Sequence, residues 1–137
     1  MNLETIIEDF EFIEDWEDRY KYIIDLGKSL DPLLESDYNT QNKVDGCASQ
    51  VWLIIKEDEI KEKKIIEFKA DSDSFLVKGL LAIIISIFSG KTPSDILKIN
   101  YDSELKKLNL KENISQQRSN GLTAVINKVI SEAQKRA

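Results

Sequence analysis

The longest apolar run in this chain of 137 residues, at positions 80–88, limits the choice of fold more than any other feature. It belongs to a predicted helix over residues 74–88, with Asp73 as its N-cap and Gly90 just after its end. Apolar side chains surround nearly the whole circumference of this helix, which is typical of a helix inside a core. A membrane-spanning helix needs about 20 apolar residues, and this run is much shorter. We therefore expect a buried core helix and no membrane segment.

Two amphipathic helices are predicted ahead of the core helix. Apolar residues recur at three- and four-residue spacing over residues 3–13, with Asn2 as a cap, and again over residues 16–30. Pro32 ends the second pattern, and residues 31–41 show no sustained period. The chain is thus predicted to open with two helices followed by a loop.

Two strands are predicted between this loop and the core helix. Residues 50–57 are rich in β-branched and aromatic residues and apolar on both faces, as expected for a strand covered on each side. Residues 64–70 alternate apolar and charged side chains, with Ile66 and Phe68 facing inward. Because residues 58–63 form a charged connection, the pair is predicted to be an antiparallel hairpin.

Shorter helices follow the core helix. Thr92, with a proline after it, predicts a new helix start, and residues 105–110 predict a further short helical piece. Ser115 is the predicted cap of a last helix, whose apolar face runs over residues 122–130. This order of elements predicts an α+β fold, in which residues 1–137 form a single domain with helices packed on a short antiparallel sheet.

Histidine is absent from the chain, and cysteine occurs once, at Cys47. A Cys/His pair and a Ser/His triad are therefore excluded, and a zinc or iron–sulfur site held by this chain alone lacks its ligands. No spacing among the acidic residues singles out a carboxylate metal site. One cysteine cannot form an internal disulfide, and the acidic start of the chain is unlike a signal peptide. We therefore expect a cytoplasmic protein without a metal.

Negative charge is concentrated in the first part of the chain. Residues 1–38 carry 12 Asp or Glu against 3 Lys or Arg, whereas the whole chain has a net charge of −6. Phosphate binding needs clustered cations, so nucleic acid is not an expected partner. Two interpretations of the acidic region remain: a solvated helix face, or a surface that steers the chain toward a basic patch on a protein partner.

Cys47 lies within the run GCASQVW at 46–52, where a polar segment changes to an apolar one. Gly46 permits a tight turn that presents the next residue at a loop tip, where a nucleophile is often displayed. Alternatively, Cys47 is a small apolar residue packed in the core. A lone thiolate can attack a sulfur on another molecule and keep that sulfur as a persulfide. Without a second cysteine, the sulfur must then leave to another protein.

The chain resembles the SufE family of sulfur acceptors, which includes CsdE-like proteins, in four motifs: GCASQVW at 46–52, ADSDSFLVKGLLA at 70–82, GKTPSDI at 90–96 and SQQRSNGL at 115–122. The resemblance covers residues 3–135, and it implies an α+β fold related to that of IscU-type iron–sulfur scaffold proteins. It further implies an acceptor that takes sulfane sulfur from a cysteine desulfurase of the SufS or CsdA type and supplies an iron–sulfur scaffold complex. Pyridoxal phosphate stays on the desulfurase, so no cofactor is expected on this chain.

The resemblance assigns roles to three residues. Cys47 matches the persulfide-forming cysteine on a loop between two strands, Asp73 the second acid of the DSD motif, and Arg118 the arginine near the start of the last helix. Cys47 would attack the outer sulfur of the desulfurase persulfide. Arg118 would stabilise the resulting anion or form an ion pair with Asp73, and Asp73 would be a catalytic acid or a helix cap. We expect a two-state loop that holds Cys47 against apolar neighbours at rest and swings it out when the desulfurase binds.

The predicted function is that of a carrier that stimulates a cysteine desulfurase and takes its sulfur on Cys47, rather than of an enzyme with a turnover of its own. One alternative is an adaptor that binds and regulates the desulfurase or a scaffold without taking sulfur. Another, an iron–sulfur scaffold, lacks the necessary number of ligands. Replacing Cys47 by serine separates carrier from adaptor, because only the carrier loses its stimulation.

Overall fold

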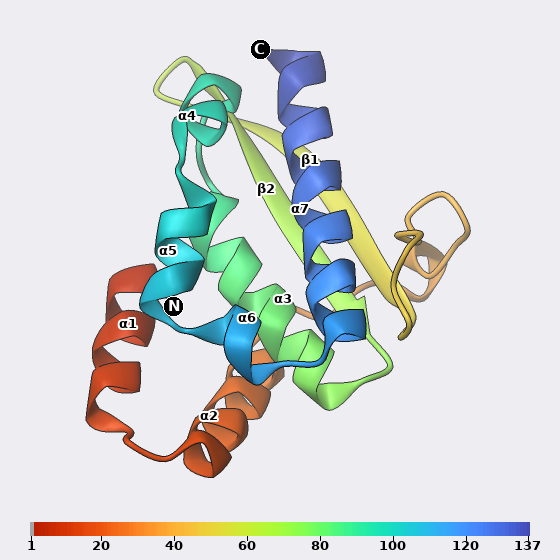
Figure 1. Cartoon of the computed structure of the whole chain (residues 1–137). Helices are drawn as coiled ribbons and strands as arrows, with labels where there is room; N and C mark the ends of the chain where they lie inside the picture. The colour runs from red at the N-terminus through yellow and green to blue at the C-terminus, as the bar shows by residue number, and fades with distance from the viewer. Residues whose placement is uncertain (1) are drawn as a thin grey trace.

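The computed structural model describes residues 2–137 and confirms the predicted α+β class, with a two-stranded antiparallel sheet packed against helices (Figure 1). In chain order the elements are α1 (Leu3–Phe12), α2 (Trp16–Lys28), the 3-10 helix η1 (Glu35–Asp37), β1 (Val51–Ile60), β2 (Lys63–Ser72), α3 (Phe75–Phe88), α4 (Pro93–Lys98), α5 (Tyr101–Lys107), α6 (Leu110–Asn113) and α7 (Gln116–Arg136).

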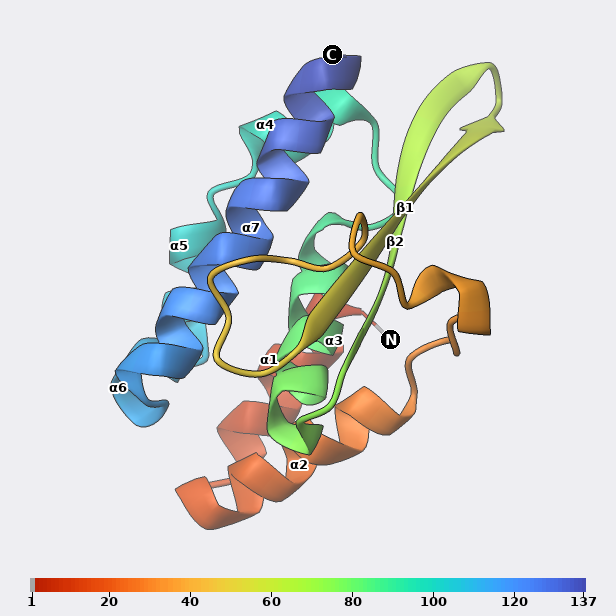
Figure 2. The same ribbon diagram turned by 90° about the vertical axis from the view of Figure 1, so that its right-hand side faces the viewer.

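Helix α3 is the centre of the fold, as its apolar run predicts. Its residues 79–84 are all buried, and it contacts α1, α2, α7 and β2. Figures 1 and 2 show it between the two N-terminal helices and α7. Gly79 lets the backbones of α2 and α3 touch, because a β-carbon built on it would lie 2.0 Å from the carbonyl oxygen of Ile23. A larger residue at this position would push the two helices apart.

The predicted helix caps are confirmed with one exception. Asn2, Thr92 and Ser115 each accept a hydrogen bond from the backbone N–H three residues later, at 2.9, 3.2 and 3.2 Å. At the start of α3 the cap is Ser74, whose Oγ accepts the corresponding bond at 3.4 Å. The prediction that Asp73 caps this helix is therefore wrong by one residue. Aspartate and serine both cap helices well. The carboxylate of Asp73 instead accepts hydrogen bonds from Gln50.

The hairpin is longer than the sequence predicts. Strands β1 and β2 are paired along their whole length, with Val51 opposite Ser72 and Ile60 opposite Lys63. The predicted charged connection over residues 58–63 is wrong, because most of it belongs to the strands. The outer half of the hairpin is exposed and projects from the body (Figure 2). Backbone hydrogen bonds between the two strands hold this half together. Because its side chains are exposed, the sequence there lacks the apolar pattern that predicts a strand.

Both faces of β1 are covered, as predicted. Val51 lines a cavity against α3, whereas Trp52 on the opposite face packs edge-on against the ring of Tyr38, with the ring centroids 5.0 Å apart. The chain near Lys43 pairs with the free edge of β1, where Lys43 lies opposite Trp52. A short third strand-like segment therefore precedes β1.

The C-terminal third differs in one detail from the prediction. Residues 105–110 do not form one helical piece, because Asn109 adopts a left-handed conformation, with a φ of 52°, between α5 and α6. Helix α7 contacts α3 and α4, and its last turn is tied to β1 by an ion pair between Arg136 and Glu57. Within residues 2–137, no helix is both long and apolar enough to cross a membrane.

Candidate functional site

Cys47 lies on a loop between two extended segments, as the sequence predicts. The ends of this loop are joined by a hydrogen bond of 2.8 Å from the Val44 N–H to the Val51 carbonyl oxygen. Gly46 has a φ of 89°, a left-handed conformation that favours glycine, so it turns the chain just before the cysteine. Figure 2 shows the loop running from the sheet toward α7 and back.

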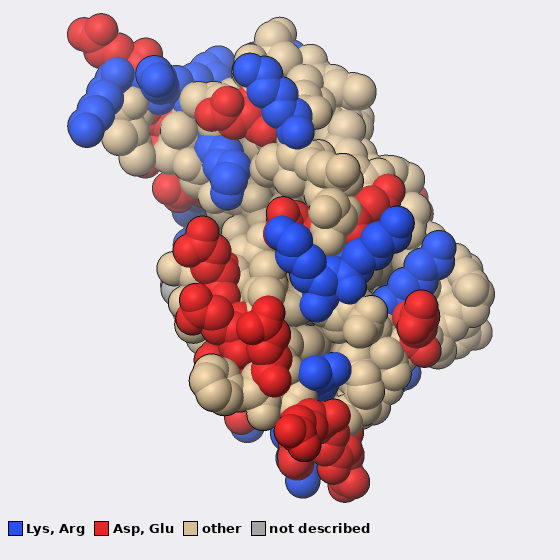
Figure 3. Space-filling model, turned by 60° about the vertical axis from the view of Figure 1, so that its left-hand side comes forward, with Lys and Arg blue, Asp and Glu red and all other residues tan. Residues whose placement is uncertain are grey.

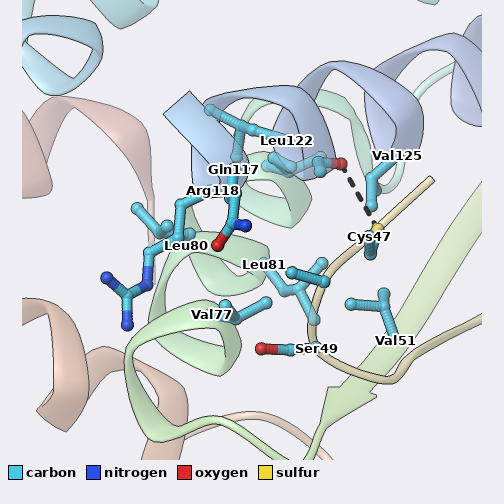
Figure 4. Close-up of a pocket in the computed structure, with 13 residues that line it drawn as sticks. Cys47, Ser49, Val51, Val77, Leu80, Leu81, Gln117, Arg118, Leu122 and Val125 are labelled. Atoms are coloured by element: carbon cyan, nitrogen blue, oxygen red, sulfur yellow. Dashed lines mark hydrogen bonds between the residues drawn. The ribbon is translucent and has the colours of Figure 1, made fainter. Parts of the chain in front are cut away.

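The thiol of Cys47 rests against the first half of α7. Its Sγ donates a hydrogen bond to the carbonyl oxygen of Gly121, with 3.6 Å between sulfur and oxygen (Figure 4). A β-carbon at position 121 would lie 3.4 Å from this sulfur, so glycine leaves the space beside the sulfur free. A β-carbon at Gly46 would similarly lie 3.5 Å from Cβ of Ala124. Both are ordinary van der Waals distances, so the loop and α7 lie against each other at these two positions.

A cavity of about 30 Å³ lies beside Cys47. This volume accommodates about one or two water-sized atoms. Cys47 is half-buried at its edge, which is the arrangement expected of the loop at rest. The walls are mainly apolar and come from β1, α3 and α7 (Figure 4): Val51, Val77, Leu80, Leu81, Leu122 and Val125.

The surroundings of Cys47 favour its protonated form. Burial raises the pKa of the thiol, and the negative charge of the nearby Asp45 raises it further. The acceptor of its hydrogen bond is a carbonyl oxygen, which stabilises the thiol and not the thiolate. At neutral pH the resting sulfur is therefore a neutral thiol, which is a weak nucleophile.

Asp73 fastens the end of the Cys47 loop to the start of α3. Its Oδ1 accepts the backbone N–H of Gln50 at 3.0 Å, and its Oδ2 accepts the side-chain amide of Gln50 at 3.3 Å. The Asp73 N–H in turn donates to the Gln50 carbonyl oxygen at 3.3 Å. This contact replaces the predicted capping role, and it makes Asp73 a residue that positions the loop.

Asp71, the first acid of the DSD motif, holds the segment that leads into the loop. Its carboxylate accepts a hydrogen bond from the hydroxyl of Tyr38 and pairs with Lys78 at 3.3 Å. Burial raises the pKa of Asp71, but the hydrogen bonds from Tyr38 and the Ser72 N–H and the charge of Lys78 outweigh burial and lower it overall. The same hydrogen bond raises the pKa of Tyr38 to about 12. The two acids of the motif thus secure the chain before and after the loop.

Arg118 lies in the first turn of α7 and lines the cavity of Cys47, but its guanidinium does not approach the sulfur. Figure 4 shows its side chain pointing away from Cys47, and the residue is exposed. Within the part of the chain that the structure describes, the predicted ion pair between Arg118 and Asp73 is not formed. The structure therefore brings Arg118 to the cavity and leaves its charge in solvent.

Sequence reasoning does not identify Gly121 as part of the site. Gly121 lies in the fourth motif, SQQRSNGL, but an isolated glycine carries no sign of what it contacts. The signal in the sequence that pointed to a shared site was the joint occurrence of the motifs that contain Cys47, Asp73 and Arg118. The structure places all three residues around one loop. Among residues 2–137, no three Cys, Asp or Glu side chains gather as a metal site requires.

Comparison with known proteins agrees with this fold and identifies the family. The model of the SufE family, described as an Fe-S metabolism associated domain, matches residues 4–133. An uncharacterised SufE-like protein of Rhizobium etli is 46% identical over 136 residues, covering 99% of this chain and 92% of the relative. An uncharacterised SufE-like protein of Rhizobium meliloti is 44% identical over 135 residues, covering 98% and 96%.

The fold is also similar to the solution structure of a hypothetical protein from Thermus thermophilus, with a TM-score of 0.72. The alignment covers 98% of this chain and 94% of the other, at 16% identity, so it supports the fold alone. The family model, in contrast, spans nearly the whole chain, and the two rhizobial relatives share close to half of its residues. The chain therefore belongs to the SufE family, whose domain is associated with iron–sulfur metabolism.

Proposed function

We propose that this protein is a sulfur acceptor that carries sulfur on Cys47. It takes sulfane sulfur from a cysteine desulfurase that uses pyridoxal phosphate, stimulates that enzyme, and passes the sulfur to an iron–sulfur scaffold complex. The observation that supports this most is the position of the chain's single cysteine. It lies on a loop that is hydrogen-bonded to α7 and borders an apolar cavity. Membership of a family associated with iron–sulfur metabolism supports the same proposal.

The transfer step needs no oxidant or reductant. The Cys47 thiol first loses its proton to solvent, and the thiolate attacks the outer sulfur of the donor's persulfide. A new S–S bond forms between Cys47 and that sulfur, while the S–S bond on the donor breaks and the donor cysteine leaves as a thiolate. The same exchange in the opposite role, with Cys47 as the leaving thiolate, delivers the sulfur to the next protein.

The resting loop protects the sulfur rather than presenting it. The thiol is neutral and half-buried, so it reacts slowly with oxidants and stray thiols until the loop moves. In this proposal the loop swings out when the desulfurase docks, and Asp73 releases Gln50 as it does so. Arg118, which has its charge free at the cavity edge, then stabilises the thiolate or the persulfide anion.

The protein acts in this proposal as a carrier without a turnover of its own. Pyridoxal phosphate belongs to the desulfurase, and the chain needs no cofactor to hold a sulfur atom. A single cysteine with no internal partner suits the reducing cytoplasm, where a free thiol persists. The alternative is an adaptor that regulates the desulfurase without taking sulfur, and an experiment must distinguish it from the carrier.

Intact-mass spectrometry after incubation with a cysteine desulfurase and cysteine tests the proposal directly. We expect one added sulfur on the wild-type chain, localised to Cys47 by fragmentation and removed by a reducing thiol. Cys47→Ser should take no sulfur and lose its stimulation of the desulfurase, whereas Ser49→Ala, a change in the same loop, should keep both. Stimulation that survives in Cys47→Ser would establish the adaptor instead.

A further inference from the structure

We propose that Phe75 is an apolar anchor for the protein that donates sulfur to Cys47. This inference rests on the proposed function and adds a part of the docking surface to it. Phe75 is the first residue of α3, and its side chain is 76% exposed. It lies outside the hydrophobic core, whereas its neighbours Leu76 and Val77 pack against that core. Aromatic side chains, Phe included, are enriched in protein–protein interfaces relative to the rest of the surface.

Phe75 is connected to the Cys47 loop through two short steps. Asp73 is bonded to Gln50 of the loop at 3.0 Å, and Phe75 follows Asp73 by two residues, which span at most about 7 Å. Ala48, Gln50 and Asp73 are themselves exposed. Exposed residues therefore lie both on the loop and on the segment that leads into Phe75.

The size of a protein interface places Phe75 within reach of the donor. Sulfur transfer requires the donor's persulfide to touch Sγ of Cys47, so the donor must cover the loop. A stable interface buries about 800 Å² on each partner, which corresponds to a patch with a radius of about 16 Å. A donor centred on the loop covers Phe75 in such a patch and buries its ring.

The same surface indicates what the donor must offer. It needs an apolar depression that receives the ring of Phe75 beside the site where its persulfide meets Cys47. A partner of this shape would make its apolar contact near the start of α3 and leave Arg118, at the edge of the cavity, to the sulfur anion.

Phe12 provides a matched control because it is the same residue type and 87% exposed. It lies at the end of α1, which Figure 1 shows on the opposite side of the molecule from the loop before β1. Neither ring is needed for the core, so alanine at either position should leave the fold intact. Circular dichroism and urea unfolding check this.

The experiment measures desulfurase binding and the rate of sulfur loading for Phe75→Ala, Phe75→Leu and Phe12→Ala. We expect Phe75→Ala to weaken binding about tenfold, Phe75→Leu to lose less, and Phe12→Ala to bind like the wild type. Loading of Cys47 by Phe75→Ala should be slow at low desulfurase concentration and recover at saturating concentration, because the chemical step is unchanged.

Equal binding by wild type and both Phe75 variants would overturn the inference while leaving the carrier function in place. So would a change in self-association, seen by analytical ultracentrifugation, without a change in desulfurase binding, because Phe75 would then contact a second copy of the chain. A failure of the proposed function looks different, because wild-type Cys47 would take no sulfur at any desulfurase concentration.

Discussion

The reactivity of Cys47 is controlled at the scale of single residues. Its Sγ has a carbonyl oxygen, a negative charge and apolar side chains as neighbours, and none of these stabilises a thiolate. The nearest cationic candidate, Arg118, points away from the sulfur (Figure 4). In the proposed function, the sulfur must therefore leave its resting contacts before it becomes a thiolate.

The raised pKa of Cys47 leads to a pH prediction. We expect alkylation by iodoacetamide to follow a pH profile whose midpoint lies above that of a free cysteine, because burial and then Asp45 favour the thiol. Asp45→Asn should move the midpoint to lower pH, whereas Asp58→Asn, in the exposed hairpin, should not.

The raised pKa of Cys47 also affects the stability of the fold. Since the folded-state pKa is raised, the neutral thiol adds stability below the unfolded pKa, and this stability is lost as pH rises through the folded value.

The bonds between Asp73 and Gln50 give a second prediction. Asp73→Ala removes both acceptors, so the loop should open more often and Cys47 should be alkylated about fivefold faster, corresponding to about 1 kcal/mol for solvent-screened bonds. Asp73→Asn keeps one acceptor and should show a smaller increase. Alkylation at the wild-type rate in Asp73→Ala would mean that this contact does not restrain the loop.

At the scale of elements, the loop before β1 is predicted to exist in two states. Hydrogen exchange of residues 44–50 should be slow in the free protein, because the loop is closed at Val44 and held at Gln50. Adding a cysteine desulfurase should speed exchange at the Gln50 amide, which loses its acceptor when the loop swings out. Exchange that is unchanged at saturating desulfurase, measured by mass spectrometry, would contradict the two-state loop.

The β1–β2 turn is a strained element that a substitution should relieve. Lys61 and Glu62 have φ values of 51° and 66°, which both positions of a type I′ turn require and which favour asparagine and glycine. The double substitution Lys61→Asn with Glu62→Gly should therefore stabilise the hairpin by about 1 kcal/mol. Urea unfolding measures the gain, and Glu62→Ala, which leaves the positive φ on a residue with a side chain, should show none.

At the scale of the whole molecule, Glu132 ties the end of α7 to the sheet. It accepts hydrogen bonds from Arg136 and Lys135 and pairs with Lys128, while Arg136 also pairs with Glu57 of β1. The hydrogen bond from Arg136 is the largest influence and lowers the pKa of Glu132, which burial opposes. The charged form of Glu132 therefore helps to hold α7 in the position from which Gly121 meets Cys47.

This network predicts an acid-dependent loss of stability. Because the folded-state pKa of Glu132 is lowered, its contribution is present above the unfolded pKa and is lost as pH falls through the folded value. The free energy of unfolding of Glu132→Gln should be lower than wild type at pH 7, and the difference should shrink on acidification toward pH 3. Glu112→Gln, an exposed control on α6, should follow the wild type throughout.

The distribution of charge over the molecule follows the sequence. Figure 3 shows carboxylates gathered on the lower part of one face, at the height of α1 and α2 in Figure 1, with Lys and Arg side chains above them. Exposed acids of α1 and the following turn include Glu8, Glu11 and Glu14. That this acidic region steers the protein toward a basic patch on a partner stays a prediction. It is tested by measuring how the rate of association with the partner depends on ionic strength.

Local signals in the sequence were sufficient for the elements and for the reactive atom. Apolar periodicity predicts the helices, because it acts over three or four residues, and the run in α3 predicts the core helix because nearly its whole circumference is apolar. The absence of histidine beside a single cysteine limits the available chemistry to that of one thiol. The cap of α3 and the ends of β1 and β2 were predicted less well, since their local patterns suit two neighbouring positions equally.

Only the tertiary structure decided how the thiol is held. The bond from Cys47 to Gly121 joins residues 74 positions apart, and the bond from Gln50 to Asp73 joins residues 23 apart. Such contacts leave no periodic trace, because each depends on how α3, α7 and the sheet pack as rigid elements. The sequence by itself thus determined that the chain has one thiol, and the packing determined that this thiol rests half-buried with Arg118 turned away.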